Sequence, residues 1–199
     1  MDIWQAIETR RSIRRFTEKK IPFSDLQKLV YAASLAPSGG NLQPWRFLLV
    51  DNPVQCEKVF STLAWAAYLG PAGRPKEGER PVAYTVFLHD TEIRGEIAVA
   101  DHAAAVENLL LAAVSMGIGG CWIGSIEKEN LAKILNLPES LHIVFVVALG
   151  YPAEDACIEP VRETIRYWRD KEGVQRVPKR NVETLTIQNS FDEKRKKKI

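Results

Sequence analysis

Arg10-Arg11-Ser12-Ile13-Arg14-Arg15-Phe16 places four guanidinium groups and one hydroxyl within six residues. Arginine stays charged at any working pH, and its rigid fork of N–H donors matches the oxygens of a phosphate. The stretch is therefore a candidate site for a phosphorylated ligand. A simpler interpretation is that cations near a helix C-terminus complement its dipole and remain solvated. The stretch by itself leaves both interpretations open.

A short amphipathic helix is predicted directly before this stretch. Asp2 is a suitable N-cap, and Gln5, three positions later, completes a capping box. Ile3, Ala6 and Ile7 then share one apolar face. The arginines thus follow the end of a helix, where the chain turns extended.

Composition indicates one soluble domain. The 199 residues are 46% hydrophobic and 26% charged, which is ordinary for a globular protein with a substantial core. The formal net charge of +2 is too small to indicate nucleic-acid binding. We expect one domain over residues 1–190. The lysine-rich residues 191–199 are more typical of a solvated, disordered tail than of a nucleic-acid patch.

The cysteines and the apolar segments predict a cytoplasmic protein. Cys56, Cys121 and Cys157 are odd in number and lack the spacing of metal ligands or of a disulfide framework. Reduced thiols and no metal are expected. The alanine-rich segment near residue 100 contains Asp101 and Glu107, so it predicts a buried helix and no membrane span.

A second stretch, Ala36-Pro37-Ser38-Gly39-Gly40-Asn41-Leu42-Gln43-Pro44-Trp45, is dense in turn formers and small polar groups. Its glycines let the backbone approach a ligand closely, and Ser38, Asn41 and Gln43 can donate and accept toward a planar polar edge. By itself it is also compatible with an ordinary connection between a helix and the apolar strand Arg46–Val50.

Further elements follow from capping residues and apolar runs. Ser24 is expected to cap a helix with Gln27 at its third position, and Asn52-Pro53 to open another. A helix over Ile93–Met116 is apolar on most sides and must be covered on most sides. Apolar runs predict the remaining elements, namely strands at Ala83–Leu88, Cys121–Ser125 with its tight turn and His142–Leu149, and helices at Glu127–Leu135 and Val161–Trp168.

Motifs in a fixed order resemble the flavin-dependent nitroreductase family. R-x-S-x-R-x-F occupies residues 10–16, and A-P-S-x-x-N-x-Q-P-W-x-F occupies residues 36–47. C-W-I-G follows a glycine-rich helix end at residues 121–124, and G-Y-P ends the last buried strand at residues 150–152. The resemblance covers most of the chain.

The resemblance implies an α+β, nitroreductase-like fold with a central mixed β-sheet flanked by helices. It also implies an intertwined homodimer with an exchanged C-terminal strand at Val182–Ile187. The implied activity moves hydride from NADH or NADPH via flavin N5 of FMN to a nitroaromatic, quinone or similar small-molecule acceptor by a ping-pong mechanism. The cofactor would carry this chemistry, so no catalytic side chain is predicted. An FMN storage or delivery protein without turnover, and related flavin reactions, remain alternatives.

The resemblance also assigns residues to the cofactor. The arginine stretch and a basic element near residue 180 would hold the phosphate, with Arg14 at the pyrimidine edge. The loop near residue 40, from the partner subunit, would address the ring and ribityl chain, and the turn after residue 123 would face N5. The predicted cofactor-binding set is Arg10, Arg11, Ser12, Arg14, Pro37, Ser38, Asn41, Gln43, Ile123, Gly124, Ser125, Lys179 and Arg180.

The loop Gly70–Pro81 and the residues before it correspond to the region over the open face of the flavin in similar proteins. Trp65, Tyr68 and Arg74 are the predicted substrate pocket. Two other polar features have simpler explanations. His102 and Glu107 are more typical of a buried or interface polar pair than of catalysis. Cys121 is more typical of a buried strand thiol than of a nucleophile.

Overall fold

The computed structural model describes residues 1–190, which divide into two compact units. The first is Met1–Glu154, and the second begins at Asp155. Residues 191–199, for which a tail is predicted, lie outside the described part.

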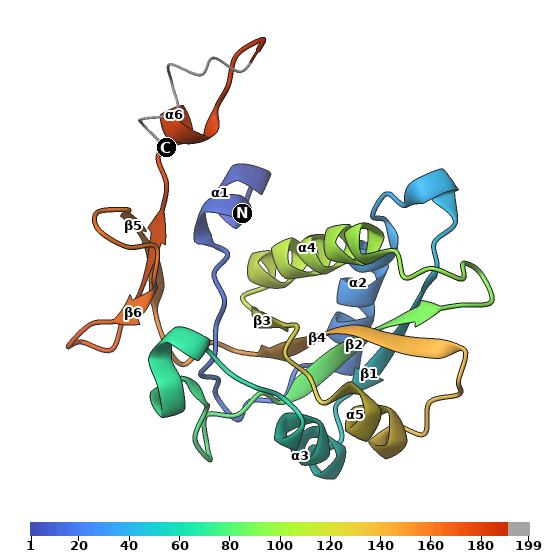
Figure 1. Cartoon of the computed structure of the whole chain (residues 1–199). Helices are drawn as coiled ribbons and strands as arrows, with labels where there is room; N and C mark the ends of the chain where they lie inside the picture. Colours follow the sequence, from blue (N-terminus) through green and yellow to red (C-terminus); the bar gives the residue numbers. More distant parts are fainter. Residues whose placement is uncertain (191–199) are drawn as a thin grey trace. The chain divides into compact units, whose positions relative to one another are not determined.

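The first unit is built on a four-stranded sheet in the order β1-β2-β4-β3 (Figure 1). Each neighbouring pair is antiparallel, so these strands do not form the mixed sheet that was expected. Parallel pairing in this unit occurs at the single bridge between Ser12 and Gly120. The strands are β1 (Trp45–Val50), β2 (Ala83–Asp90), β3 (Gly119–Ile123) and β4 (Leu141–Gly150).

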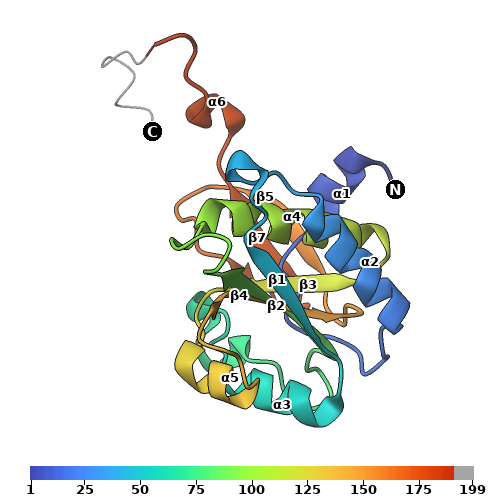
Figure 2. The same ribbon diagram turned by 90° about the vertical axis from the view of Figure 1, so that its right-hand side faces the viewer.

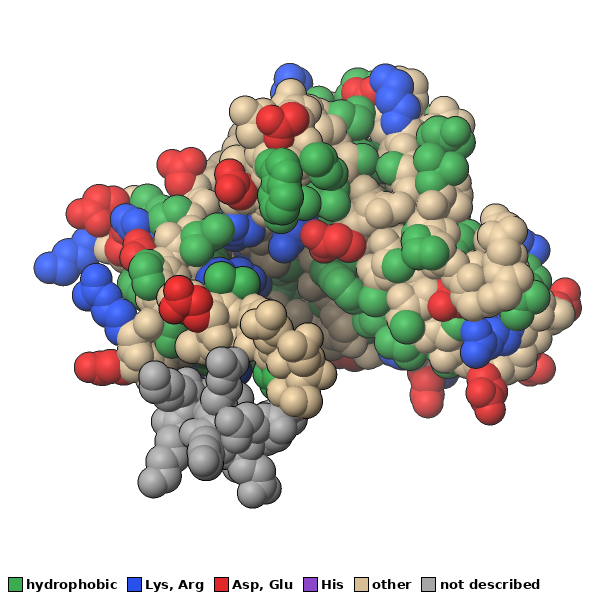
Figure 3. All heavy atoms as spheres, turned by 90° about the horizontal axis from the view of Figure 1, so that it is seen from above, with side chains coloured by type: hydrophobic (Ala, Val, Ile, Leu, Met, Phe, Trp, Pro, Cys, Tyr) green, Lys and Arg blue, Asp and Glu red, His purple; other side chains and the backbone are tan. Residues whose placement is uncertain are grey.

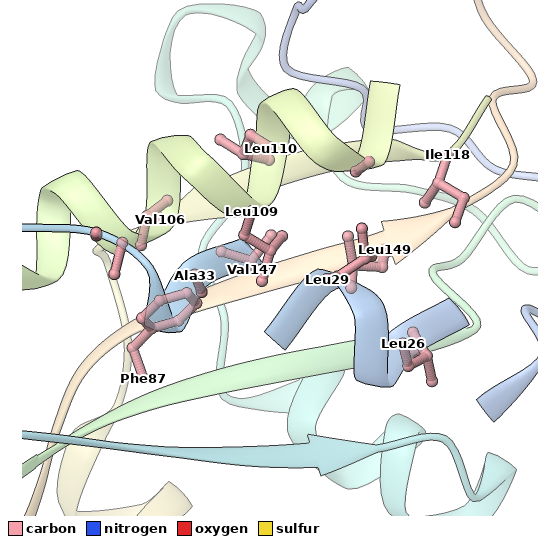
Figure 4. Close-up of a cluster of buried hydrophobic side chains, with 14 of the residues drawn as sticks. Leu26, Leu29, Ala33, Phe87, Val106, Leu109, Leu110, Ile118, Val147 and Leu149 are labelled. Carbon is pink, nitrogen blue, oxygen red and sulfur yellow. The ribbon is translucent and has the colours of Figure 1, made fainter. Parts of the chain in front are cut away.

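Helices cover both faces of this sheet (Figures 1 and 2). On one face α2 (Phe23–Ser34) and α4 (Val99–Ser115) pack together, and on the other lie α3 (Pro53–Ser61) and α5 (Lys128–Ile134). Because side chains alternate along a strand, β2 supplies Phe87 to the first core and Val86 to the second. Figure 4 shows the first core, where Leu29 of α2 lies beside Leu149 and Ala33 of α2 beside Phe87.

The helix predictions are confirmed in part. The capping box of α1 (Ile3–Thr9) is present, since Asp2 accepts from the Gln5 backbone N–H and Gln5 accepts from that of Asp2. Pro53 occupies the first turn of α3, which Asn52 caps. The Ser24 cap is wrong. The α2 helix begins at Phe23 because the carbonyl of Pro22 already accepts from two first-turn amides.

The long helix begins later than predicted. α4 starts at Val99, because Asp90 accepts from the backbone amides of residues 92–94 and folds them into a turn. Its burial is one-sided, with Ala105, Val106 and Leu109 against the sheet and Glu107 half-buried at its side. The sequence predicts that this helix is covered on most sides, but within this chain α4 is covered on one side.

The second unit is a small sheet in the order β5-β7-β6. The predicted helix at residues 161–168 is wrong, since that segment consists of bends and irregular chain and ends at Trp168, which pairs with Arg176. Residues 182–185 form one helical turn, and their exchange with a partner stays a prediction. The elements are β5 (Ala156–Pro160), β6 (Trp168–Arg169), β7 (Gln175–Lys179) and α6 (Val182–Leu185), and the first unit also contains the 3₁₀ turns η1 (Gly39–Asn41) and η2 (Ala67–Gly73).

Within residues 1–190, no helix combines the length and the apolar character that crossing a bilayer requires. The same part of the chain holds no grouping of three or more histidine, cysteine or acidic side chains suited to a metal ion. Cys56, Cys121 and Cys157 are free thiols.

Candidate functional site

The arginine stretch lies extended between two parts of the sheet. Ser12 forms a parallel bridge with Gly120, and the Ile13 N–H donates to the Gly120 carbonyl at 3.0 Å. On the other side Phe16 bridges Pro152 in the antiparallel sense. The stretch is thus fixed as an additional strand segment beside the start of β3.

Two glycines accept the apolar side chains of this stretch. A Cβ on Gly150 would lie 2.7 Å from Phe16 Cδ1 and 2.9 Å from Phe16 Cβ, which is closer than atoms can approach. A Cβ on Gly119 would lie 3.0 Å from Ile13 Cβ. Phe16 is fully buried and Ile13 nearly so. Glycine is required here for close approach, and the packed side chains leave the polar residues between them in a defined orientation.

The four guanidinium groups have different surroundings. Arg10 pairs with Glu107 at 2.9 Å, and Arg15 with Glu79 at 3.5 Å. Arg11 is buried and donates to the carbonyls of Glu8 and Arg10. Arg11 thus takes the helix-terminus role that the sequence left open. The predicted pairing of Glu107 with His102 is not formed.

The backbone of Arg14 is held by an acid that the sequence analysis did not single out. Glu154 Oε1 accepts from the Arg14 N–H at 2.5 Å and from the Arg15 N–H at 3.2 Å. Arg14 also lies beside Cys121, where burial raises the pKa of the thiol and the nearby guanidinium partly opposes that rise. Cys121 is therefore a protonated, buried thiol, as the strand interpretation predicts.

The loop between α2 and β1 is exposed and conformationally unusual. Asn41 and Gln43 have φ of 55° and 50°, in the left-handed region, and both side chains are exposed. Ser38 Oγ accepts from the Gln43 N–H at 3.0 Å, and Gln43 Nε2 lies 3.3 Å from Asn41 Oδ1. Left-handed conformations in residues other than glycine cost about 1–3 kcal/mol and concentrate at functional sites.

The turn after β3 presents open backbone. Gly124 and Ser125 are exposed, whereas Ile123 is buried. A Cβ on Gly124 would meet nothing closer than the ring of Phe145 at 4.0 Å. The Ser125 carbonyl accepts from the Ala64 N–H at 3.1 Å, so this turn lies beside the segment that leads to η2.

The three residues of the predicted substrate pocket have distinct environments. Trp65 is buried with its ring 5.6 Å from that of Phe60. Tyr68 is exposed. Arg74 donates to the Leu63 carbonyl at 3.3 Å and lies 4.4 Å above the Phe60 ring, which fixes its guanidinium by a cation–π contact. The expected pocket role of these residues stays a prediction.

Comparison with known proteins identifies the family. The sequence profile of the Nitroreductase family matches residues 7–151. The chain belongs to the nitroreductase family. It is 35% identical over 156 residues to a provisionally named NADH dehydrogenase/NAD(P)H nitroreductase of Archaeoglobus fulgidus, which covers 75% of this chain and 84% of that protein.

Other proteins are similar to this nitroreductase-family chain at lower identity. An iodotyrosine deiodinase of Thermotoga neapolitana is 28% identical over 180 residues, or 82% of this chain and 95% of that protein. The crystal structure of a nitroreductase with bound FMN from Bacteroides fragilis is 26% identical, with a TM-score of 0.61, over 77% of this chain and 89% of that chain. The nitroreductase-like α+β fold is confirmed.

In this nitroreductase-family chain, β3 joins two of the predicted clusters. Ser12 lies at its start and Gly124 follows its end, about 13 Å apart at the rise of a strand. The loop containing Asn41 belongs to the β1 edge, at the opposite side of the four-stranded sheet. Lys179 ends β7 and Arg180 follows it, both in the second unit.

Sequence reasoning missed the acids and histidines that support these clusters. Glu154 and Asp101 accept from amides 140 and 62 positions away, and His89 contacts His102, which is 13 positions away. None of the three stands in a recognisable motif. Their partners are fixed by tertiary packing, so a single sequence carries no local signal for them.

Proposed function

We propose that this protein is an FMN-dependent oxidoreductase that takes electrons from NADH or NADPH and delivers them to a small oxidised acceptor. The carrying observation is the rigid Ser12–Arg14 segment at one end of β3 together with the open Gly124 backbone at the other. The FMN in the Bacteroides fragilis structure and the NAD(P)H in the name of the Archaeoglobus protein support it.

The residues present fit FMN by their chemistry. FMN combines one terminal phosphate with a planar ring of polar edges. Arg10 and Ser12 offer a cation and a hydroxyl to the phosphate. The assignment of Lys179 and Arg180 to the cofactor stays a prediction. We propose that residues 1–190 act as one FMN-binding domain. When bound, FMN would supply the two-electron redox chemistry between NADH or NADPH and the acceptor.

The chain's own residues would bind and orient the FMN and tune its reduction. Arg14 keeps its charge at every working pH and, at the pyrimidine edge, would favour the negative charge that reduction deposits there. The backbone at Arg14 is fixed in place, because Glu154 accepts hydrogen bonds from two successive amides. The exposed Gly124–Ser125 backbone lets a ring approach without a side chain in between.

A second copy of the chain would complete the site. Within one chain the Ser38–Gln43 loop and Gly124 belong to opposite edges of the sheet, three strand spacings or about 14 Å apart across it. Hydrophobic side chains are exposed on the face seen in Figure 3. In α1, Ile3 and Trp4 are 61% and 70% exposed. A face of this kind is typical of an interface. We propose a homodimer in which this loop reaches the partner's site.

The test starts from the purified full chain. We expect a yellow protein that releases FMN on denaturation, is bleached by NADH or NADPH without oxygen, and is reoxidised by an acceptor. The acceptor panel contains a quinone, a nitroaromatic and iodotyrosine, the last because a deiodinase is among the relatives. Light scattering of the loaded protein should report a dimer.

Matched double variants assign the phosphate site. Arg10→Ala with Ser12→Ala should remove most of the bound flavin. Arg46→Ala with Ser61→Ala removes the same two groups at exposed positions and should retain the colour. Full flavin retention in the first variant contradicts the proposed site. Flavin that is bound but never reduced indicates an FMN storage or delivery protein.

A further inference from the structure

The loop that carries Asn41 and Gln43 is tied to the sheet's helical layer through one acid. Asp101 Oδ2, in the first turn of α4, accepts from the Gly39 N–H at 3.2 Å. The same oxygen lies 3.6 Å from Arg94 Nη1. Asp101 is largely buried, with 14% of its side chain exposed. A Cβ on Gly39 would lie 3.3 Å from Arg94 Nη1, so the ion pair sits directly against the loop backbone.

Most of the loop's other hydrogen bonds close on the loop itself, apart from the Gln43 carbonyl, which accepts from the Trp45 N–H of β1 at 2.8 Å. The Asn41 N–H donates to the Ser38 carbonyl at 2.9 Å, and Gln43 binds Ser38 and Asn41. Gly40, Asn41 and Gln43 all have positive φ within four residues. A strained loop persists only where its surroundings hold it, and Asp101 supplies that hold from outside the loop.

Asp101 and Arg94 together form a clamp on the loop backbone. A buried histidine pair fixes both of these residues. His89 Nε2 lies 2.7 Å from the Arg94 carbonyl, which can only accept, so this nitrogen carries the hydrogen. His89 Nδ1 then accepts from His102 Nε2 at 3.2 Å when both rings are neutral. Both histidines are fully buried. His89 thus holds the backbone of Arg94, and His102 is the neighbour of Asp101 on α4.

We infer that Asp101 is a positioning residue for the flavin, holding the Ser38–Gln43 loop in its binding conformation before the cofactor arrives. Arg94 orients the carboxylate, and the His89–His102 pair fixes both parts of the clamp. This inference rests on the proposed function, in which the loop contacts the flavin. Its benefit is pre-organisation, because a loop that is already ordered loses less entropy on binding.

The alternative is that Asp101 only complements the dipole at the start of α4. Asp25 provides the matched control, since it occupies the first turn of α2 and pairs with Lys28 at 2.8 Å. A helix-start role predicts that Asp101→Asn and Asp25→Asn behave alike. The clamp predicts that only the change at Asp101 reaches the loop.

The experiment measures amide hydrogen exchange of Gly39 in the FMN-free protein and the Kd for FMN. In Asp101→Ala we expect Gly39 exchange to be about tenfold faster and FMN binding about tenfold weaker, the effect of losing one charge-assisted hydrogen bond. Asp101→Asn keeps an acceptor and should show a smaller change. Arg94→Lys keeps the ion pair and should retain wild-type values.

The outcomes separate this inference from the proposed function. Unchanged Gly39 exchange and unchanged FMN affinity in Asp101→Ala overturn the clamp. Equal effects of Asp101→Asn and Asp25→Asn on Gly39 exchange and FMN affinity overturn it as well. Failure of the wild-type protein to bind FMN contradicts the proposed function and the cofactor half of this inference. Gly39 exchange still decides in that case whether Asp101 holds the loop, because it is measured without FMN.

Discussion

The arginine stretch at residues 10–16 and the loop at residues 38–43 carry comparable polar groups but are held in opposite ways. Packing fixes the stretch, with Phe16 fully buried against Gly150 and backbone hydrogen bonds on both sides. Polar contacts fix the loop, whose Asn41 and Gln43 are exposed in left-handed conformations. The stretch is held by apolar packing and by its backbone pairing with the sheet, whereas the loop is held by polar contacts to Asp101 on α4 and to Trp45 on β1.

The difference indicates how the proposed site would divide its tasks. A segment fixed by packing resists any change that leaves the core intact, so it can define where a phosphate binds. A loop that holds strain through a few polar contacts responds to mutation, pH and ligand. We therefore expect mutation, pH and ligand to affect the two regions differently.

The largest effect is expected at the packed stretch. Phe16→Ala removes a fully buried ring and should lower the free energy of unfolding by about 3–5 kcal/mol. Gly150→Ala forces a Cβ to within 2.9 Å of Phe16 Cβ and should cost about 1–3 kcal/mol. The double variant should cost less than the sum, because the methyl group added at position 150 occupies part of the space that the ring leaves. Urea unfolding of the FMN-free protein measures all three.

Gly124→Ala is the control for this cycle, since its Cβ would have 4.0 Å of clearance and φ there is not positive. Its free energy of unfolding should stay within about 0.5 kcal/mol of wild type. Additive effects at positions 16 and 150 would show that the ring does not depend on the glycine, and the contrast between stretch and loop would lose its physical basis.

Lowering the pH should destabilise the loop at residues 38–43 before it destabilises the arginine stretch. Burial, reinforced by His89, lowers the pKa of His102 to about 4, while Asp101 raises it slightly and the ring of Trp45 adds no charge. The unfolded chain titrates near 6.5, so it binds a proton that the folded chain excludes between these values. Stability is therefore complete above about pH 6.5 and falls toward about pH 4, by at most about 3 kcal/mol.

Urea unfolding between about pH 7 and about pH 4 tests this expectation. His102→Gln keeps a donor toward His89 and cannot titrate, so its stability should fall less than that of wild type across this window. His142→Gln, at an exposed position, should follow the wild type. Amide exchange should accelerate at Gly39 before it accelerates at Ile13, whose N–H bonds to Gly120. Equal slopes for the wild type and His102→Gln would contradict the pKa assignment.

Local signals in the sequence predicted the elements that are fixed locally. The capping box at Asp2 and the Pro53 helix start are set by residues three positions apart or fewer, and both are confirmed. The uninterrupted apolar run within β4 required cover on both faces, which the two cores supply. The fold followed from these patterns together with the family motifs.

The failures occur where distant partners override local preference. Residues 161–168 have helical spacing, but Trp168 pairs with Arg176 in a sheet. The start of α4 moves to Val99 because Asp90 binds the preceding amides. The residues of the proposed site lie in motifs and could be named as candidates. Their supports, Glu154 and Asp101, act across more than 60 positions and could not be.

The smallest effect is expected at Gln43, and its sign is the sharpest test of the comparison. Glycine adopts left-handed φ without the steric cost that alanine bears, about 1 kcal/mol at a φ of 50°. Gln43→Gly should therefore unfold at higher urea than Gln43→Ala, although both lack the same side chain. Gln27, exposed within α2, is the control, because there glycine should be about 1 kcal/mol less stable than alanine. At position 43, Gln43→Gly should bind FMN more weakly than Gln43→Ala. The glycine loop is more stable but less ordered, so it must lose more entropy on binding. If Gln43→Gly is less stable than Gln43→Ala, the loop holds no strain at this position, and its exposed amides are positioned by packing as the arginine stretch is.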